Sequence, residues 1–319
     1  MNSRHVHPRR CLEMLLICEV LLTVGPACVI DAYAQEQAEP NTSPFAESLE
    51  ASTDELPKTL FTWNTANDEQ EDQASEDDSI VTDRPHFSEA SSLVGLGRVQ
   101  VESGFTLSLD SFSGVRSRQY SFPETLYRIG LFQEWFELRV GYNYLVEKSH
   151  DGFGNKTNLS GSDDLYLGAK LALTEQDGWL PEMAIFPQAR IPTGHKDFTS
   201  GEVLPGFNLA YSWLLSDFIE LECNTQLNRR KDGSNHIYLE AIQTANVEYL
   251  FSDKFEGFTE WFCLLPDGSI DPDTGPQHYL HGGFAYKIRP NVQADIHSGV
   301  GLNSHSTNAF HGAGFSFRL

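Results

Sequence analysis

The stretch FELRVGYNY, residues 136–144, alternates apolar and polar side chains with a period of two residues. One set of alternate positions is apolar or aromatic: Phe136, Leu138, Val140, Tyr142 and Tyr144. The other set is polar, charged or small: Glu137, Arg139, Gly141 and Asn143. Because successive side chains of a β-strand point to opposite faces, the pattern predicts a strand with one apolar and one polar face.

The same alternation returns along the rest of the chain, in twelve segments of about ten residues each. A tilted strand of this length crosses the apolar part of a bilayer. The predicted strands are 98–109, 122–131, 135–146, 162–174, 181–191, 205–215, 218–228, 237–250, 255–265, 278–288, 291–300 and 309–319.

The connections between these segments alternate in length. The short ones are 132–135, 174–180, 215–218, 251–255 and 289–291, and the long ones are near 110–121, 147–161, 192–204, 229–236, 266–277 and 301–308. Transmembrane barrels have short turns on the periplasmic side and long loops outside, with an even number of strands. The sequence therefore predicts an all-β fold, an antiparallel transmembrane β-barrel of about 12 strands.

A β-sandwich with solvated outer faces is the competing architecture, since it also alternates apolar and polar residues. Two features favour the barrel. Aromatic residues such as Tyr142 and Trp213 lie near strand ends, where membrane interfaces place them. The final stretch GAGFSFRL, residues 312–319, continues as a strand up to Leu319, and pairing with the first strand would hold it.

The chain divides into three predicted parts. Residues 1–34 have arginines, an apolar run and an Ala-x-Ala site, and are expected to be a cleaved signal peptide. Residues 35–80 contain 13 acidic residues and one base, and are expected to be a disordered acidic spacer. Residues 81–319 are expected to form the barrel. The formal net charge of −23 disfavours nucleic acid as a partner.

Several motifs, in order, resemble the phenol-degradation-pathway MetA family of outer-membrane barrels. They are VTDRPHFSEASSLVGLGRVQVESGF (81–105), DDLYLGAKL (163–171), RIPTG (190–194), FTEWF (258–262), HYLHGGFAY (278–286) and SGVGLN (298–303). The resemblance implies a transporter in the outer membrane, with aromatic or otherwise hydrophobic compounds as substrates, whereas the charged polar faces of the strands argue equally for polar solutes. The chain departs from the family at Ser162 and at Leu319, where a glycine and an aromatic residue are usual.

The polar faces of the predicted strands are charged, which suggests residues that line a pore. The candidates are Glu102, Arg128, Glu137, Arg139, Lys170, Glu182, Arg190, Glu222, Glu240, Glu248, Glu260, Asp295, His297 and Arg318. With Glu220 and Lys287 added there are nine acids and six bases, so a weak preference for cations is expected. The alternative is that these charges pair with each other and fill a narrow barrel.

Three further features carry candidate roles. RPHFSE, residues 84–89, either enters the barrel as a plug or closes its periplasmic mouth. His297 and the stretch HST, 305–307, invite comparison with hydrolytic sites, but no third orienting group is identified, so no enzyme is predicted. DGSIDPDTG, 267–275, misses the spacing of a calcium loop. No cofactor and no metal are expected.

The predicted function is passive passage of small molecules across the outer membrane of a diderm bacterium. The expected partners are outer-membrane lipid, small-molecule solutes and the barrel-assembly machinery. The alternative is a non-transporting envelope barrel whose acidic spacer binds a periplasmic partner.

Overall fold

A computed structural model of the chain describes residues 58–61, 79–112 and 114–319. The predicted signal peptide lies outside the described residues, and so does most of the predicted spacer. Among the described residues there is no helix with the length and apolar character needed to cross a bilayer.

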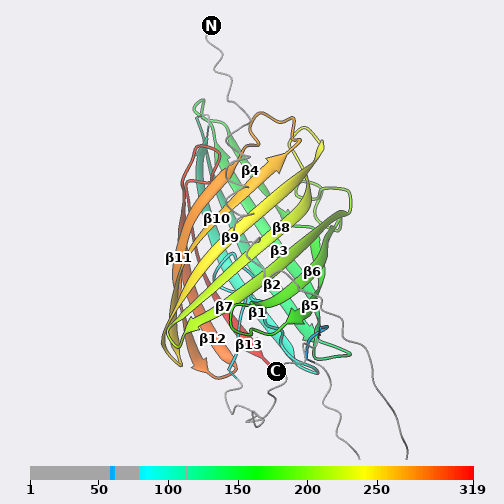
Figure 1. Cartoon of the computed structure of the whole chain (residues 1–319). Helices are drawn as coiled ribbons and strands as arrows, with labels where there is room; N and C mark the ends of the chain where they lie inside the picture. Colours follow the sequence, from blue (N-terminus) through cyan, green and yellow to red (C-terminus); the bar gives the residue numbers. More distant parts are fainter. Residues whose placement is uncertain (1–57, 62–78, 113) are drawn as a thin grey trace, which may run out of the picture. The chain divides into compact units, whose positions relative to one another are not determined.

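Thirteen strands form one antiparallel sheet (Figure 1). They are β1 (Val99–Phe112), β2 (Val115–Gly130), β3 (Phe136–His150), β4 (Lys156–Ser162), β5 (Leu165–Thr174), β6 (Glu182–Ile191), β7 (Leu204–Ser216), β8 (Ile219–Lys231), β9 (Ile237–Ser252), β10 (Phe255–Asp267), β11 (Gln277–Arg289), β12 (Val292–Gly301) and β13 (Ala309–Arg318). β4 and β5 both pair with β3, one after the other, so together they form a single interrupted strand of a twelve-stranded wall.

The sheet closes because β1 pairs with β13 as well as with β2. The register runs from Gln100 opposite Arg318 to Leu109 opposite Ala309, and the amide of Leu319 donates to the Val99 carbonyl at 2.8 Å. The predicted all-β barrel of twelve strands is therefore confirmed. The last strand, β13, lies between β12 and β1 and pairs with both.

Two predicted long loops are wrong. The chain over 110–121 extends β1 to Phe112 and begins β2 at Val115, and the chain over 147–161 continues β3 and β4 to a turn at 151–155. Both stretches are rich in hydroxyl and charged side chains and lack an apolar face. They extend strands whose backbone hydrogen bonds do not depend on lipid, which is why apolar alternation does not reveal them.

The barrel is apolar outside and polar inside. Outward side chains such as Leu167, Phe207 and Ile296 are exposed. The largest fully buried side chains are mostly charged or amide-bearing: Arg128, Arg139, Lys170, Gln100, Gln293, Glu102, Glu137, Glu260, Asn208 and Asn224. An apolar cluster, by contrast, comprises Ala184, Phe186 and Ala210, with Leu93 packed against it. Charge pairing and hydrogen bonds thus take the place of an extended apolar core.

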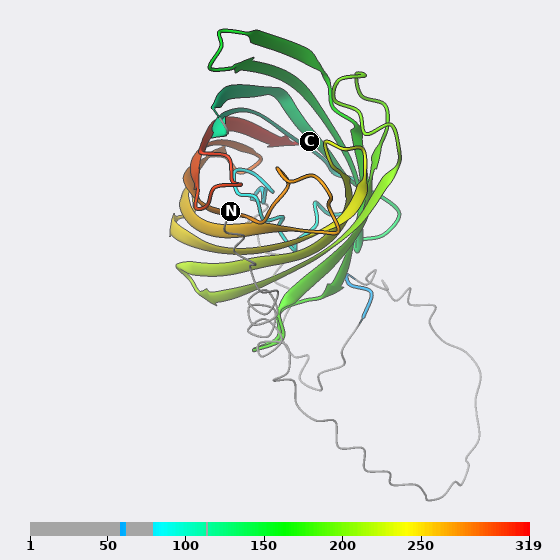
Figure 2. The same ribbon diagram turned by 90° about the horizontal axis from the view of Figure 1, so that it is seen from above.

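Residues 80–96, which we call the inner segment, lie inside the ring of strands. Viewed along the barrel, this part of the chain crosses the interior in cyan (Figure 2). Ile80, Ala90 and Val94 are almost fully buried, and the amide of Ile80 donates to the Pro290 carbonyl at 2.6 Å. Of the two alternatives for RPHFSE, the structure therefore has the one in which it enters the barrel.

Candidate functional site

Asp83 is the central anchor of the inner segment. Its carboxylate lies 2.7 Å from the Arg139 guanidinium, 3.5 Å from that of Arg128 and 3.7 Å from the Lys170 ammonium. Its backbone amide donates to the Glu102 carboxylate at 3.0 Å. Three cations from β2, β3 and β5 thus converge on a single inner-segment carboxylate, and attraction of this kind is strong at buried sites.

The same cations also bind wall carboxylates and the inner-segment backbone. Arg128 donates to Glu137 at 2.9 Å, and Arg139 lies 3.1 Å from Glu89. The Lys170 ammonium donates to the carbonyls of Ala90 and Ser92, each at 2.8 Å. We call this set the paired network; it consists of Asp83, Glu89, Glu102, Glu137, Arg128, Arg139 and Lys170. Its four acids and three bases nearly balance, as burial of charge requires.

Arg84 ties the inner segment to the strands at the closure of the barrel. Its guanidinium lies 3.2 Å from Asp295 and 3.3 Å from Glu124. Gly104 and Gly314 face each other across the β1–β13 pair, and a Cβ on either would lie within 2.4 Å of that guanidinium. The two glycines therefore leave the space that Arg84 occupies.

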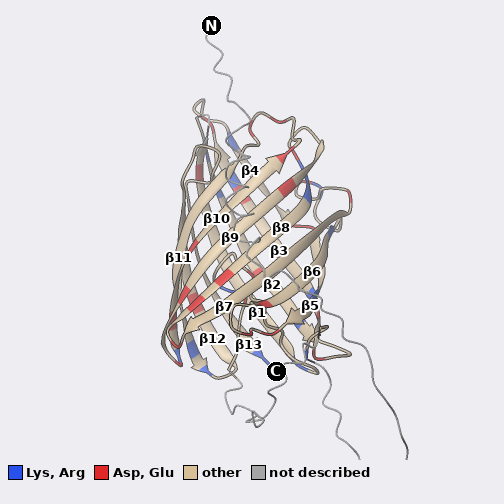
Figure 3. Cartoon of the chain, in the orientation of Figure 1, with Lys and Arg blue, Asp and Glu red and all other residues tan. Residues whose placement is uncertain are grey.

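The β6–β11 side of the lumen is acidic. One register row carries Glu182, Ser212, Glu222, Asn246, Glu260 and His281 on successive strands. Figure 3 shows acidic positions recurring along the strands on this side. We call Glu182, Glu220, Glu222 and Glu248 the acidic face.

Two inner-segment groups meet this side. His86 Nε2 lies 2.8 Å from Glu248 Oε1 and 3.5 Å from Glu222 Oε2. Glu260 accepts hydrogen bonds from the amides of Phe87 at 2.8 Å and Ser88 at 2.6 Å. The Phe87 ring also stacks on Phe262 at a centroid distance of 4.2 Å. The inner segment is thus held on both sides of the lumen by directional polar contacts.

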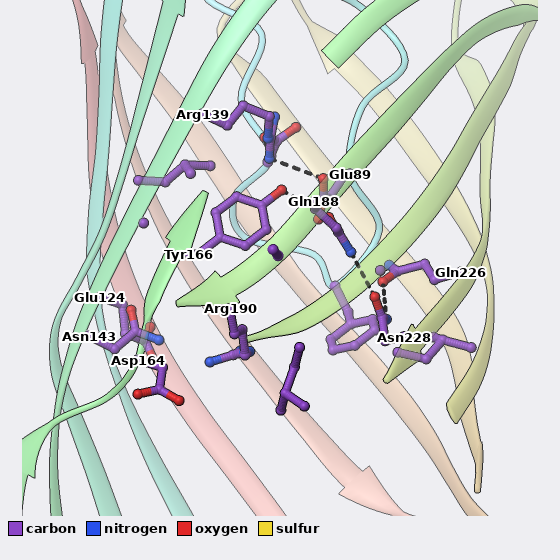
Figure 4. Close-up of a pocket in the computed structure, with 18 of the residues that line it drawn as sticks. Glu89, Glu124, Arg139, Asn143, Asp164, Tyr166, Gln188, Arg190, Gln226 and Asn228 are labelled. Atoms are coloured by element: carbon purple, nitrogen blue, oxygen red, sulfur yellow. Dashed lines mark hydrogen bonds and ion pairs between the residues drawn. The ribbon is translucent and has the colours of Figure 1, made fainter. Parts of the chain in front are cut away.

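A cavity of about 320 Å³ lies between the inner segment and the wall. Figure 4 shows its polar side chains, with Gln188 donating to Asn228 at 2.9 Å and Tyr166 turned toward Gln188. Apolar groups also line it, from Phe87, Leu126, Leu204 and Ile242. The cavity therefore offers both apolar surface and hydrogen-bonding groups, which is the mixture that small-molecule sites use.

The loop at 192–203 covers the interruption between β4 and β5. Asp164 accepts hydrogen bonds from the Gly194 amide at 3.0 Å and from the Ser200 amide at 2.9 Å. The His195 amide donates to the Ser162 carbonyl at 2.8 Å. These contacts close the wall beside the cavity, where β4 has no partner strand on its second edge among the described residues.

The predicted pore-lining residues all come from the inward faces of the strands, but they do not share one environment. Five of them belong to the paired network: Glu102, Arg128, Glu137, Arg139 and Lys170. Arg190 pairs with Asp163 at 2.6 Å and Glu240 with Arg230 at 2.8 Å, both toward the loops. Arg318 lies at the closure and is 8% exposed. The cluster around His86 was not predicted, because His86 lies far from Glu222 and Glu248 in the sequence.

His297 and the calcium-like loop take part in other contacts. His297 Nδ1 lies 2.9 Å from His281 Nε2. Asp295, two residues before His297, accepts a hydrogen bond from Arg84 instead of orienting the His297 ring. Ser306 donates to the His278 carbonyl at 2.9 Å. In the loop, the Asp273 amide donates to Asp271 at 3.0 Å. These arrangements hold turns and strands together.

Asp232, at the end of β8, joins two loops. Its carboxylate accepts hydrogen bonds from the amides of Ser234 and His236, at 3.0 and 2.8 Å, and from Ser269 Oγ and the Ile270 amide, at 2.9 and 3.1 Å. Partial desolvation acts to raise the pKa of Asp232, but these donors outweigh it and lower the pKa to about 2.

Two solved structures illustrate what the fold is similar to. The COG4313 outer membrane channel from Pseudomonas putida F1 is 11% identical, with a TM-score of 0.59, and the match covers 74% of this chain and 100% of that one. The transport unit of the autotransporter AIDA-I from Escherichia coli is 9% identical, with a TM-score of 0.50, covering 69% and 90%. At these identities the likeness establishes the fold. Among curated proteins, none is significantly similar to the chain in sequence.

A family model described as "Putative MetA-pathway of phenol degradation" matches residues 82–319, which include the inner segment from Thr82 onward and every strand of the barrel. The earlier resemblance, drawn from six short motifs, is thereby confirmed over the whole barrel. The chain belongs to this family.

Proposed function

We propose that the chain is an outer-membrane channel for passive passage of small molecules, without covalent chemistry. The observation that carries the proposal is the lumen: its wall and the inner segment are joined by charged and amide side chains around a cavity of about 320 Å³. The burial of polar groups inside the barrel costs less free energy when water or solutes can form hydrogen bonds with them. Twelve strands also place the barrel between filled eight-stranded barrels and open sixteen-stranded porins.

We further propose small aromatic molecules with polar substituents as the solutes. The cavity supports this class through its mixture of apolar lining, from Leu126, Leu204 and Ile242, with the hydrogen-bonding groups of Tyr166 and Gln188. The family description, which refers to phenol degradation, agrees with it. A leader over 1–34 and a spacer over 35–80 complete the proposed precursor, which the barrel-assembly machinery would insert.

The test is uptake and conductance of the full chain purified from outer membranes. In proteoliposomes, a small phenol should enter faster than a sugar of similar size, and planar bilayers should show discrete current steps. Asn228→Phe, which fills the cavity, should slow uptake severalfold. Leu227→Phe is the matched control, because Leu227 is 47% exposed on the outer face. A folded barrel that passes neither ions nor phenol would contradict the proposal.

The competing proposal is an envelope barrel whose acidic spacer binds a periplasmic partner. One contact places part of this spacer beside the barrel wall: the amide of Leu60 donates to the Ala172 carbonyl at 3.0 Å and that of Phe61 to the Leu173 carbonyl at 3.3 Å. Deletion of 35–78 separates the two proposals. A channel keeps its flux without the spacer, whereas a partner-binding barrel keeps its fold and loses its role.

A further inference from the structure

His86 is held in one protonation pattern by its own segment. Its Nδ1 lies 2.7 Å from the Ser88 carbonyl oxygen. A carbonyl only accepts hydrogen bonds, so Nδ1 must carry a proton. The remaining ring nitrogen, Nε2, is therefore the atom that points at the wall. Fixing of a histidine tautomer by a backbone carbonyl is the arrangement found behind many metal-binding imidazoles.

Nε2 faces two carboxylates from neighbouring strands. Glu248 Oε1 on β9 lies at 2.8 Å and Glu222 Oε2 on β8 at 3.5 Å. A lone pair on Nε2 would oppose the lone pairs of both oxygens, so a positive species has to lie between them, either a proton or a metal ion. The side chains are 3% exposed for His86, 6% for Glu222 and 15% for Glu248, which raises the cost of leaving this charge unmatched.

The spacing fits coordination. Among the described residues this is the one group of three or more His, Cys, Asp or Glu side chains that could hold a metal, and its ligand atoms all lie within 4.8 Å of one another. Nitrogen and oxygen ligands about 2.1 Å from a tetrahedral ion are roughly 3.4 Å apart. The two distances from Nε2 lie on either side of that value.

Asn246 supplies an independent indication. It is fully buried, and its Nδ2 donates to Glu222 Oε2 at 3.1 Å and to Glu248 Oε1 at 3.4 Å. Its Oδ1, also buried, has no hydrogen-bond partner among the described residues. Rotation of this amide by 180° exchanges the two atoms and turns an oxygen toward the carboxylates, where a metal ion would accept it as a ligand.

We propose that His86, Glu222 and Glu248, with Asn246 behind them, form a binding site for a divalent transition-metal ion such as Zn²⁺. One imidazole and two carboxylates are ligands that Zn²⁺ accepts. Because His86 belongs to the inner segment and the carboxylates to β8 and β9, the ion would fasten this segment to the wall. The inference does not depend on the channel function, since metal binding is measured without any flux.

The experiment uses the full chain, purified from outer membranes and stripped with a chelator. Calorimetric titration with Zn²⁺ should give one tight site per chain, and Co²⁺ should give a visible absorption band of a nitrogen- and oxygen-ligated ion. His86→Gln and Glu222→Gln should each weaken Zn²⁺ binding by about tenfold or more. His297→Gln, which removes another lumenal histidine, should bind as the unchanged protein does.

Equal affinity in His86→Gln would assign the ion to other acidic residues and overturn the proposal. Absence of tight binding would mean that a proton alone occupies the position, with the same consequence. One measurement needs no variant: one equivalent of Zn²⁺ should slow amide hydrogen exchange over residues 85–91 and leave 309–318 unchanged. Unchanged exchange over 85–91 would also overturn the proposal.

Discussion

Between β1 and β5 the lumenal wall carries Arg128, Arg139 and Lys170, whereas the row from β6 to β10 carries Glu182, Glu222 and Glu260. In the first region, each acid of the inner segment or wall has a guanidinium or ammonium nearby. In the second, carboxylates are stabilised by amides, hydroxyls and imidazoles. One lumen thus buries charge in two ways, by neutralisation and by hydrogen bonding.

The largest expected effect tests neutralisation. Arg139→Met leaves Asp83, Glu89 and Glu137 without one shared cation, although the side chain still fills the space. Breaking a buried ion pair by removing one partner costs about 3–5 kcal/mol. Equilibrium urea unfolding of the refolded barrel should show a loss of that order. Arg190→Met is the control, because the Arg190 side chain is 34% exposed and its pair with Asp163 contributes about 0–1 kcal/mol. Similar losses in both variants would contradict the comparison.

The next effect tests hydrogen bonding on the β6–β11 side of the lumen. Glu260→Gln removes a charge from a region rich in acids, yet we expect it to destabilise the barrel. The new amide nitrogen cannot accept from the Phe87 or Ser88 amides, and an orphaned buried donor costs about 1–3 kcal/mol. Urea unfolding measures the loss, and faster amide exchange at Phe87 and Ser88 locates it. A stabilised variant would show that simple repulsion dominates at this position.

A smaller effect of opposite sign is expected at Glu220. Glu220 and Glu248 are directly opposite in the β8–β9 register, and like charges so placed are destabilising. Glu220→Gln should therefore stabilise the barrel by about 0.2–1 kcal/mol. In a salt gradient across a bilayer, its reversal potential should shift toward weaker cation preference. Glu175→Gln, in an exposed turn, should change neither quantity.

The smallest effect concerns the loops, where the Asp232 carboxylate accepts hydrogen bonds from neutral donors. The pKa of Asp232 is lowered from its usual 3.8 to about 2. Because the folded-state pKa is the lower one, the stabilisation is complete above about pH 4 and is lost as the pH falls from 3.8 toward 2. Amide exchange at Ile270 should accelerate over that range, and Asp232→Asn should remove the dependence. Acceleration above pH 5 would point to another group.

The positions of the strands could be predicted because each face of a membrane strand meets one uniform environment along its whole length. The alternation in 136–144 therefore survives as a wall strand with Glu137 and Arg139 inside. Stretches without an apolar face, such as 147–161, have no such contrast, and their strand structure was missed. Loop length alone was a poor guide there.

The candidate site could be predicted only in part. The inward position of charges such as Glu102 and Lys170 follows from alternation, but their partners do not. Asp83 and His86 stand in a short stretch without periodicity, and their contacts depend on how strands far along the chain curve around them. The one signal was a charged, non-alternating stretch directly before the first strand, which allowed a plug or a mouth cover and by itself favoured the mouth cover.

The inner segment also has a consequence for the order of folding. The pair between Arg84 and Asp295 joins residues 211 positions apart. The pair between His86 and Glu248 joins residues that have strands β1 to β8 between them in the sequence. Contacts of such long range form late, because the intervening chain must be ordered first. The inner segment is synthesised before the strands. It can therefore complete its bonds only when β12 is in position. The full set of bonds between the inner segment and the wall therefore marks a barrel whose strands have all assembled.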